Sequence, residues 1–210
     1  MLKSLISLNG GVAARYIAGA AAGGADFWGQ RTGVWTRGTY NTGSRSYTDG
    51  ASRPSDGRIV VVSWSNSEQG VYSDDNGATW SNSSTPGESW RSCSYCTYYD
   101  EWIIVGDYSG SHFAYSSDGI NWTSNNPGSG QFAIATDHNG KYVSCSYKNN
   151  VAYYSTNGGR NWTQITNPTG AAWGYDIQYG NGWWVCANRG SSTVMRSQDG
   201  INWTGCLLNR

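Results

Sequence analysis

The chain has 210 residues, of which 38% are apolar and only 13% are charged, with 29 glycines, 15 tyrosines and 12 tryptophans. Such a composition is typical of short strands joined by tight turns, and it predicts an all-β protein. The 14 basic residues balance the 14 acidic residues. Because no strong field would draw in phosphates or anionic lipids, we expect neither nucleic-acid binding nor membrane insertion.

Five tryptophans recur at separations of 45, 42, 40 and 41 residues, and each is followed at once by Thr or Ser. A fixed period near forty residues indicates a repeat architecture, which favours a single domain over residues 1–210. The repeats cover approximately residues 1–36, 37–82, 83–124, 125–164 and 165–206. They are anchored on Trp35, Trp80, Trp122, Trp162 and Trp203.

The first repeat has diverged from the others. It keeps Gly33 and Trp35 but has lost the Ser and Asp of the later repeats, and Asn9 and Arg15 interrupt the apolar run that a secretory signal would need. Residues 15–35 align without a gap on residues 183–203. This alignment predicts that the first repeat is a divergent copy of the same structural unit. The alternative is that residues 1–25 form an assembly arm that holds a neighbouring subunit.

Each repeat contains the pattern of four short strands. A β-rich run begins 19 or 20 residues before the Trp, as in Val60–Val62, and a turn-forming pair such as Asp56-Gly57 precedes it. A third run leads into a turn motif, and a fourth run leaves that motif at the Trp. Four strands in about forty residues, repeated five times, predict a five-bladed β-propeller of four-stranded antiparallel blades.

The turn before the fourth strand carries Ser, Asp or Asn, and Gly at regular places before the Trp. We expect the Asp to accept backbone N–H bonds, the Gly to adopt positive φ and the Trp ring to pack against the sheet. These structural residues are Ser73, Asp75, Gly77, Trp80, Ser116, Asp118, Trp122, Ser155, Asn157, Gly159, Trp162, Ser197, Asp199 and Trp203.

This motif resembles the Asp-box, or bacterial neuraminidase repeat, of β-propellers, whose pattern is Ser-x-Asp-x-Gly-x-x-Trp. Residues 73–80 match in full, the boxes at Ser116 and Ser197 are one residue shorter, and the third box has Asn157 in place of Asp. The resemblance implies boxes at the perimeter of the blades, away from the functional face.

Residues 176–185 and 197–203 look like repeats that are common in phage tail, fibre and decoration proteins. That resemblance implies a non-enzymatic component of a virion, bound to other virion structural proteins, with homo-oligomers and recognition of a host-surface glycan as further expectations. An extracellular or cell-surface protein is the alternative location, and a cellular assembly factor or a lectin is an alternative function.

The five cysteines are an odd number, which argues against a complete disulfide framework. Cys93 and Cys96 form a C-x-x-C without a second pair at metal-ligand spacing, so we expect neither a metal nor a cofactor. Cys145 and Cys186 share one register of the repeat with Ala18, Ser63 and Val105, which indicates small buried strand residues.

An enzyme of sialidase-like ancestry is the main alternative to a binding protein. Inward carboxylates for glycan hydrolysis would have to come from Asp100, Asp107, Asp137 or Asp176, and no spacing singles out a pair. We therefore expect no enzymatic activity and no catalytic residue.

Loops with proline or glycine follow three of the boxes and lead to an aromatic residue at the start of the next repeat. Such loops converge on one face of a propeller, where aromatic rings edged by polar groups suit stacking on sugars. The candidate ligand-binding residues are Tyr47, Trp90, Arg91, Tyr95, Phe132, Trp173, Tyr175 and Asp176. In the alternative interpretation, these aromatic residues plug the channel or pack one blade against another.

Overall fold

The computed structural model describes residues 46–64, 69–87, 89–106, 112–146, 148, 150–188 and 193–207. These residues form four antiparallel sheets of four strands each, and none of them is helical. A search of the described residues accordingly gives no helix with the length and apolar character of a membrane span. The first predicted repeat, residues 1–36, and the alternative arm, residues 1–25, lie outside the described residues.

The strands follow the chain in order within each sheet. Sheet 1 comprises β1 (Tyr47–Ser52), β2 (Ile59–Ser63), β3 (Val71–Ser73) and β4 (Ser81–Asn82). Sheet 2 comprises β5 (Trp90–Cys96), β6 (Glu101–Gly106), β7 (His112–Ser116) and β8 (Thr123–Asn125). Sheet 3 comprises β9 (Ala133–Thr136), β10 (Tyr142–Cys145), β11 (Val151–Ser155) and β12 (Thr163–Thr166). Sheet 4 comprises β13 (Ile177–Gly180), β14 (Trp183–Ala187), β15 (Thr193–Ser197) and β16 (Thr204–Leu207).

Each sheet corresponds to one predicted repeat, from residues 37–82 to residues 165–206. The all-β prediction and the prediction of four antiparallel strands per repeat are confirmed for these four repeats. The turns between first and second strands have the expected chemistry, because Gly57, Gly140 and Gly182 all have positive φ angles, of 78°, 100° and 79°. The four sheets are arranged as blades of a β-propeller. The fifth blade, which the sequence assigns to residues 1–36, stays a prediction.

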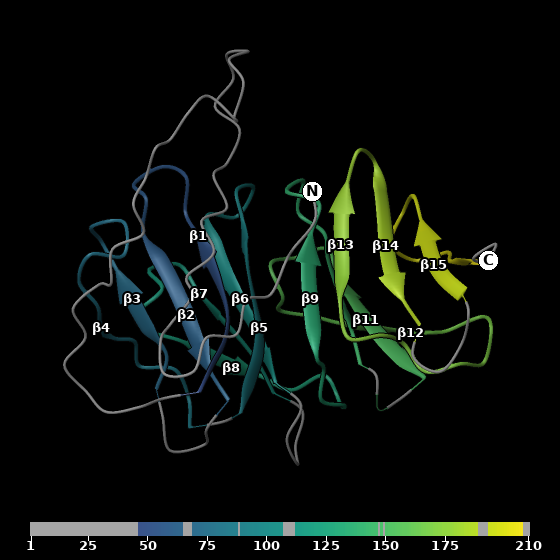
Figure 1. Ribbon diagram of the computed structural model, residues 1–210, viewed down its shortest axis with the longest axis horizontal. Coiled ribbons are helices and arrows are strands. Elements are labelled where there is room, and N and C mark those ends of the chain that lie inside the picture. The colour runs from purple at the N-terminus through teal and green to yellow at the C-terminus, as the bar shows by residue number, and fades with distance from the viewer. Residues whose placement is uncertain are drawn as a thin grey trace.

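The first strands of the sheets lie beside one another in the order β1, β5, β9, β13, and the sheets fan out from them (Figure 1). Polar side chains join these strands. Thr48 Oγ1 donates to the Trp90 carbonyl at 2.9 Å, and Ser92 Oγ donates to Asp49 Oδ2 at 2.7 Å. Ser92 Oγ also accepts a hydrogen bond from the Ile134 N–H at 3.3 Å. Side-chain hydrogen bonds, rather than a continuous ladder of backbone hydrogen bonds, therefore connect the first strands of sheets 1, 2 and 3.

The apolar core lies between neighbouring sheets. Between sheets 1 and 2 it includes Val60, Val62, Trp90, Trp102 and Ile104. Between sheets 2 and 3 it includes Ile103, Val105, Phe113, Ile134 and Tyr142. Between sheets 3 and 4 it includes Val143, Cys145, Trp173, Trp184 and Cys186. Because sheets 2 and 3 are covered on both faces, β6 and β10 are buried at every residue, which accounts for their nearly continuous apolar sequences.

The four turns between third and fourth strands share one hydrogen-bonded geometry, and we call them box hairpins (residues 73–80, 116–122, 155–162 and 197–203). In the first, Ser73 Oγ donates to Asp75 Oδ1 at 2.8 Å and accepts from the Gly77 N–H at 2.8 Å. Asp75 Oδ1 also accepts from the Thr79 N–H at 2.8 Å. The structural role predicted for Ser, Asp and Gly is thus confirmed in this turn.

Asn157 performs the acceptor role of Asp in the third box hairpin. Its Oδ1 atom accepts from Ser155 Oγ at 3.0 Å and from the Asn161 N–H at 2.9 Å. An amide oxygen supplies the same acceptor as a carboxylate, so the departure from the motif leaves the turn intact. The Trp162 Nε1–H donates to the Gly159 carbonyl at 2.9 Å, as Trp80 and Trp203 do to their own glycines.

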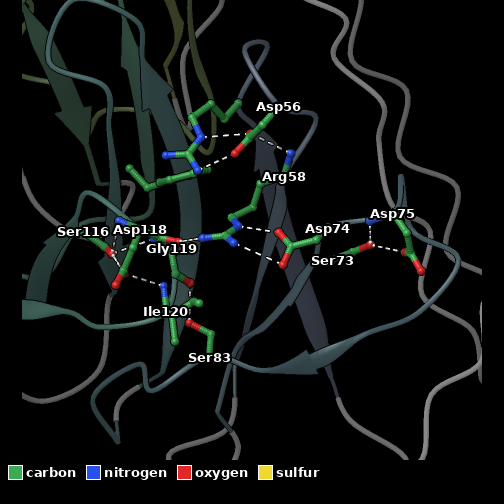
Figure 2. A network of polar contacts seen from close by, with 12 residues as sticks. Asp56, Arg58, Ser73, Asp74, Asp75, Ser83, Ser116, Asp118, Gly119 and Ile120 are labelled. Carbon is green, nitrogen blue, oxygen red and sulfur yellow. Dashed lines mark hydrogen bonds and ion pairs between the residues drawn. The ribbon is translucent and has the colours of Figure 1, made fainter.

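Each box hairpin of sheets 2 to 4 packs on the preceding sheet. Figure 2 shows the first of these contacts, where Arg58 lies between Asp74 of its own sheet and Asp118 of sheet 2. Arg58 Nε donates to Asp74 Oδ1 at 2.5 Å, and Arg58 Nη1 donates to the Asp118 carbonyl at 2.5 Å. Ser83 Oγ donates to the Gly119 carbonyl at 2.8 Å and accepts from Trp122 Nε1 at 2.8 Å. The box hairpin therefore also joins one sheet to the next.

Candidate functional site

The starts of the first strands and the ends of the second strands meet at one end of the sheets, because these strands are antiparallel. Backbone bonds hold the connecting segments there. The Trp64 N–H donates to the Ser46 carbonyl at 2.8 Å, and the Phe132 N–H donates to the Cys145 carbonyl at 2.8 Å. The Gln131 N–H donates to the Gly106 carbonyl at 2.7 Å, which links sheet 3 to sheet 2.

At this end of the sheets, one side chain from each of four repeats joins a continuous row. The Arg91 Cζ atom lies 4.2 Å from the centroid of the Trp64 ring and 5.0 Å from that of the Phe132 ring. The Phe132 ring meets the Tyr175 ring edge to face, with centroids 5.3 Å apart. We call Trp64, Arg91, Phe132 and Tyr175 the aromatic row. Both ends of the row are open to solvent, with Trp64 49% and Tyr175 51% exposed.

A β-bulge directs Arg91 into the row. The pairing between β5 and β6 shifts between Trp90 and Ser92, so Arg91 is the additional residue on its strand. Bulges of this kind turn a side chain away from the regular alternation. As a result Trp90 enters the core while Arg91 contacts the rings on either side. The equivalent shift in β1, between Tyr47 and Asp49, places the Thr48 hydroxyl on the Trp90 carbonyl.

The aromatic row combines two kinds of binding chemistry. Exposed ring faces attract apolar C–H surfaces, and a guanidinium held between rings presents N–H donors in a fixed orientation. Asp176 lies next to Tyr175, and its Oδ1 accepts from Gln178 Nε2 at 2.9 Å and from the Ile177 N–H at 3.0 Å. The row thus suits a ligand with an apolar face and with acceptor oxygens at its edge.

The structure divides the predicted ligand-binding residues into two groups. Arg91, Phe132 and Tyr175 lie together in the aromatic row, with Asp176 adjacent. Trp90 and Trp173 are only 1% and 0% exposed, and they take the role stated as the alternative, packing one sheet against another.

Tyr95 and Tyr47 lie away from the open part of the row. Tyr95 is buried near the opposite end of β5, where its hydroxyl donates to Asp100. Burial and the Asp100 carboxylate raise the pKa of Tyr95 above its ordinary value. The side chain of Tyr47 packs with Ile59, Val61 and Val71 on the face of sheet 1 that is turned away from sheet 2. These two residues therefore contribute to packing in the described structure.

Trp64 was not among the residues predicted from sequence. It directly follows β2, whereas the candidate residues were sought in the loops that open each repeat. The repeat register therefore gave no reason to select it. The signal that could have indicated it is an aromatic residue directly after the second strand and outside the box motif.

The acidic residues considered for glycan hydrolysis do not come together. Asp100 and Asp137 lie in turns between first and second strands, whereas Asp176 precedes β13 at the opposite end of the sheets. Asp107 lies outside the described residues. In the described part of the chain, no group of three or more His, Cys, Asp or Glu residues is arranged to hold a metal ion.

No protein-family model matches the chain, and no curated protein matches its sequence. Solved structures do match its fold. Catalytically inactive virginiamycin B lyase from Staphylococcus aureus, solved with quinupristin, superposes with a TM-score of 0.72 and 11% identity over 86% of this chain and 61% of the lyase. YCF48 from Cyanidioschyzon merolae superposes with a TM-score of 0.61 and 13% identity over 79% of this chain and 57% of YCF48.

A GH74 enzyme from Niastella koreensis superposes with a TM-score of 0.59 and 20% identity, over 80% of this chain and 25% of the enzyme. These neighbours are β-propeller proteins, which agrees with the four sheets described here. The chain spans less than two thirds of the length of each of these solved chains. Because all identities are 20% or lower, the likeness extends to the fold alone.

Proposed function

We propose that this protein is a non-enzymatic β-propeller that binds a glycan across the aromatic row. The supporting observation is that Trp64, Arg91, Phe132 and Tyr175 come from four different repeats and meet at one end of the sheets. A packing role requires burial, whereas both ends of the row are about half exposed. The stability of the fold does not by itself require the Arg91 guanidinium to lie between the Trp64 and Phe132 rings.

A glycan fits this chemistry better than a purely apolar ligand. The C–H face of a pyranose stacks on an aromatic ring, and its hydroxyl or carboxylate oxygens accept hydrogen bonds from a guanidinium. Arg91 stands between Trp64 and Phe132, so one sugar on either ring brings its oxygens within reach of the same donor. A chain of two or three sugars along the row uses all four side chains.

As to biological setting, we propose a structural or accessory component of a phage virion, as part of a tail, fibre or decoration. This rests on the resemblance of residues 176–185 and 197–203 to repeats of such proteins. Host-glycan recognition is a function that a virion surface requires, and the aromatic row supplies a surface for it.

We propose further that residues 1–36 add a fifth blade beside sheet 1. Trp35 stands one repeat before Trp80, and 45 residues precede the first described residue, which is the length of one repeat. Ile59, Val61 and Val71 are buried on the face of sheet 1 that is turned away from sheet 2. Because that face carries the same kind of apolar residues as the internal faces, a blade is the cover that fits it.

A second candidate function is recognition of a peptide from another protein. YCF48 has been solved bound to D1 peptide, and the chain superposes on that structure with a TM-score of 0.58 and 16% identity over 77% of its own length and 54% of YCF48. A guanidinium between rings also suits a peptide carboxylate. An assembly factor of this kind would bind a protein terminus rather than a sugar.

The test is a glycan array probed with the labelled intact protein and with Trp64→Ala and Arg91→Ala. We expect both variants to lose at least about tenfold in binding, since each removes a stacked ring or the central donor. The matched control is Tyr98→Ala, because Tyr98 is 67% exposed but lies at the opposite end of the sheets. Equal binding by all three variants would remove the aromatic row as the site. Binding to a peptide array without binding to glycans would favour the second candidate.

A further inference from the structure

Two cysteines from neighbouring sheets meet in the core between sheets 3 and 4. Cys145 ends β10 and Cys186 lies in β14, and both side chains are fully buried, as expected from the sequence. Cys186 Sγ donates a hydrogen bond to Cys145 Sγ at 3.6 Å, and Cys145 Sγ donates to the Gly174 carbonyl at 3.7 Å. Both residues are free thiols. We call Cys145 and Cys186 the thiol pair.

A difference in the length of two box hairpins turns these thiols toward each other. Counted back from the Trp of each repeat, Cys145 and Cys186 share one position, but the third box hairpin has one residue more than the fourth. In the ladders, Cys145 therefore lies three residues beyond the partner of Ser155, whereas Cys186 lies two residues beyond the partner of Ser197. Because side chains alternate along a strand, Cys145 faces sheet 4 and Cys186 faces sheet 3.

The interface between sheets 1 and 2 fills the same two positions without cysteine. By the same ladder count, the counterpart of Cys145 in sheet 1 is Val62, and the counterpart of Cys186 in sheet 2 is Ile104. Both counterparts are buried in the core between these sheets. Aliphatic side chains thus satisfy the packing at this place, so the fold does not require two thiols there.

We propose that Cys145 and Cys186 are a redox-sensitive site, at which hydrogen peroxide forms a reversible disulfide between sheets 3 and 4. One thiol loses its proton and its sulfur attacks a peroxide oxygen; the O–O bond breaks, and the leaving hydroxide takes up the proton as water. The second sulfur then attacks the resulting sulfenic acid, the S–O bond breaks, and a second water leaves with the second thiol proton. Two electrons pass from the sulfurs to the peroxide, and a dithiol reductant reverses the link.

The surroundings of the thiol pair make this oxidation slow. The hydrogen bond from Cys186, together with burial, raises the pKa of the Cys145 thiol well above its ordinary value. Since the thiolate is the reactive form, the pair withstands a brief exposure to oxidant and reacts on a long one. Hydrogen peroxide is small and uncharged, which suits it to a buried site better than a bulky disulfide reagent.

The thiol pair is connected to two members of the aromatic row. The Cys145 carbonyl accepts from the Phe132 N–H at 2.8 Å. Cys145 Sγ contacts the carbonyl of Gly174, the residue before Tyr175. A disulfide to Cys186 would hold sheets 3 and 4 together directly behind these contacts and would restrain the rings of Phe132 and Tyr175. The link and its effect on the backbone do not depend on which ligand the row binds.

Peroxide treatment of the intact folded chain tests the thiol pair. Cys206→Ser removes the partly exposed thiol and leaves four of the five cysteines. The protein is incubated with hydrogen peroxide for hours, then unfolded, alkylated and analysed by mass spectrometry. We expect alkylation of Cys93 and Cys96 only, together with a linked peptide pair that joins Cys145 to Cys186. Treatment with dithiothreitol should restore alkylation of all four.

Three outcomes would overturn the proposal: alkylation of all four cysteines after prolonged treatment, conversion of the thiol pair to sulfinic acids alone, or a link between Cys93 and Cys96. Cys93 and Cys96 lie in the cores on opposite sides of sheet 2, so a link between them would come from unfolded chains. The matched control is Cys186→Val, because Val61 holds the equivalent position in β2. In this variant the Cys145 thiol should remain free of any disulfide.

Hydrogen exchange and thermal unfolding measure what the link does to the fold. In the linked chain we expect the Phe132 N–H to exchange at least about fivefold more slowly, because its acceptor is held in place. The melting temperature should rise by at least about 4 °C, since the disulfide constrains the unfolded chain. Peroxide-treated Cys186→Val should show neither change. A linked chain with unchanged exchange and melting temperature would overturn the proposed restraint between sheets 3 and 4.

Discussion

Gly119 of sheet 2 packs on Val60 of sheet 1 so closely that a Cβ on the glycine would lie 2.6 Å from Val60 Cγ2. The glycine also has a φ of 68°. The box glycine is therefore required twice, by the turn conformation and by the distance between sheets. A sequence motif reveals the first requirement, whereas only the packed sheets reveal the second.

Gly119→Ala separates these two requirements when compared with Gly170→Ala. Gly170 has a φ of 73°, but a Cβ there would meet no atom within 4 Å. We expect Gly170→Ala to cost about 1 kcal/mol from the backbone alone, and Gly119→Ala to cost about 2–4 kcal/mol because overpacking adds to it. Urea unfolding of both variants measures the difference. Equal losses would show that sheet 1 moves away from the new methyl group at no cost.

Asp118→Asn should be much milder than Asp118→Ala. Asn157 already shows that an amide oxygen accepts the hydrogen bonds from the Ser hydroxyl and from a backbone N–H of the turn. We expect Asp118→Asn to lose less than about 0.5 kcal/mol and Asp118→Ala about 1–2 kcal/mol, since alanine leaves the Ile120 and Asn121 N–H groups without this acceptor. Thermal unfolding at neutral pH compares the two. A large loss in the Asn variant would mean that the negative charge itself holds the turn.

The box carboxylates should make the protein less stable in acid. Hydrogen bonds from the Thr79 side chain and N–H and from Ser73 lower the pKa of Asp75 to about 2. Burial opposes ionisation of Asp118, but the N–H groups of Asn121 and Ile120 and the Asn121 amide outweigh it and lower the pKa to about 2. The pKa of Asp199 is lowered in the same way, by Asn202 and Ile201 against the effect of burial.

Because these pKa values are lower in the folded chain than in the unfolded chain, the stabilisation is complete above about pH 5, where the carboxylates are ionised in both states. It is lost as the pH falls from about 5 towards 2. Melting temperatures across this range measure the loss, and Asp118→Asn should show a shallower decline than the parent protein. A melting temperature that stays constant down to pH 2 would contradict the role of these carboxylates.

Arg58 joins sheets 1 and 2, and its loss should weaken their contact. It donates to Asp74 and to the Asp118 carbonyl and lies beside the Tyr72 ring. We expect Arg58→Met, which keeps most of the aliphatic stem, to cost about 1–2 kcal/mol. Asp74→Asn is the control that removes only the ion pair, and at a partly exposed site it should cost less than about 1 kcal/mol. If the two variants lose the same stability, the bond between the sheets contributes nothing.

The sequence alone determined the elements of this fold. The period of the tryptophans located the repeats, and the turn pairs and box residues located the strand ends, so that sheets 1 to 4 match the repeats over residues 37–206. Box chemistry was equally readable, because the hydrogen bonds among Ser73, Asp75 and Gly77 connect residues within one turn. Such local interactions depend on the spacing of residues along the chain, and this spacing can be read directly from the sequence.

Tertiary structure alone decided which aromatic residues face solvent. Trp90 and Trp173 open their repeats just as a ligand-binding residue would, yet the neighbouring sheets bury them. A one-residue bulge at Arg91 reverses which side chain faces the core, and Trp64 joins the row only because sheet 1 brings it beside sheet 2. The exposure of a side chain and its contacts with another sheet depend on residues that are distant along the chain. They are therefore determined only when the sheets pack together.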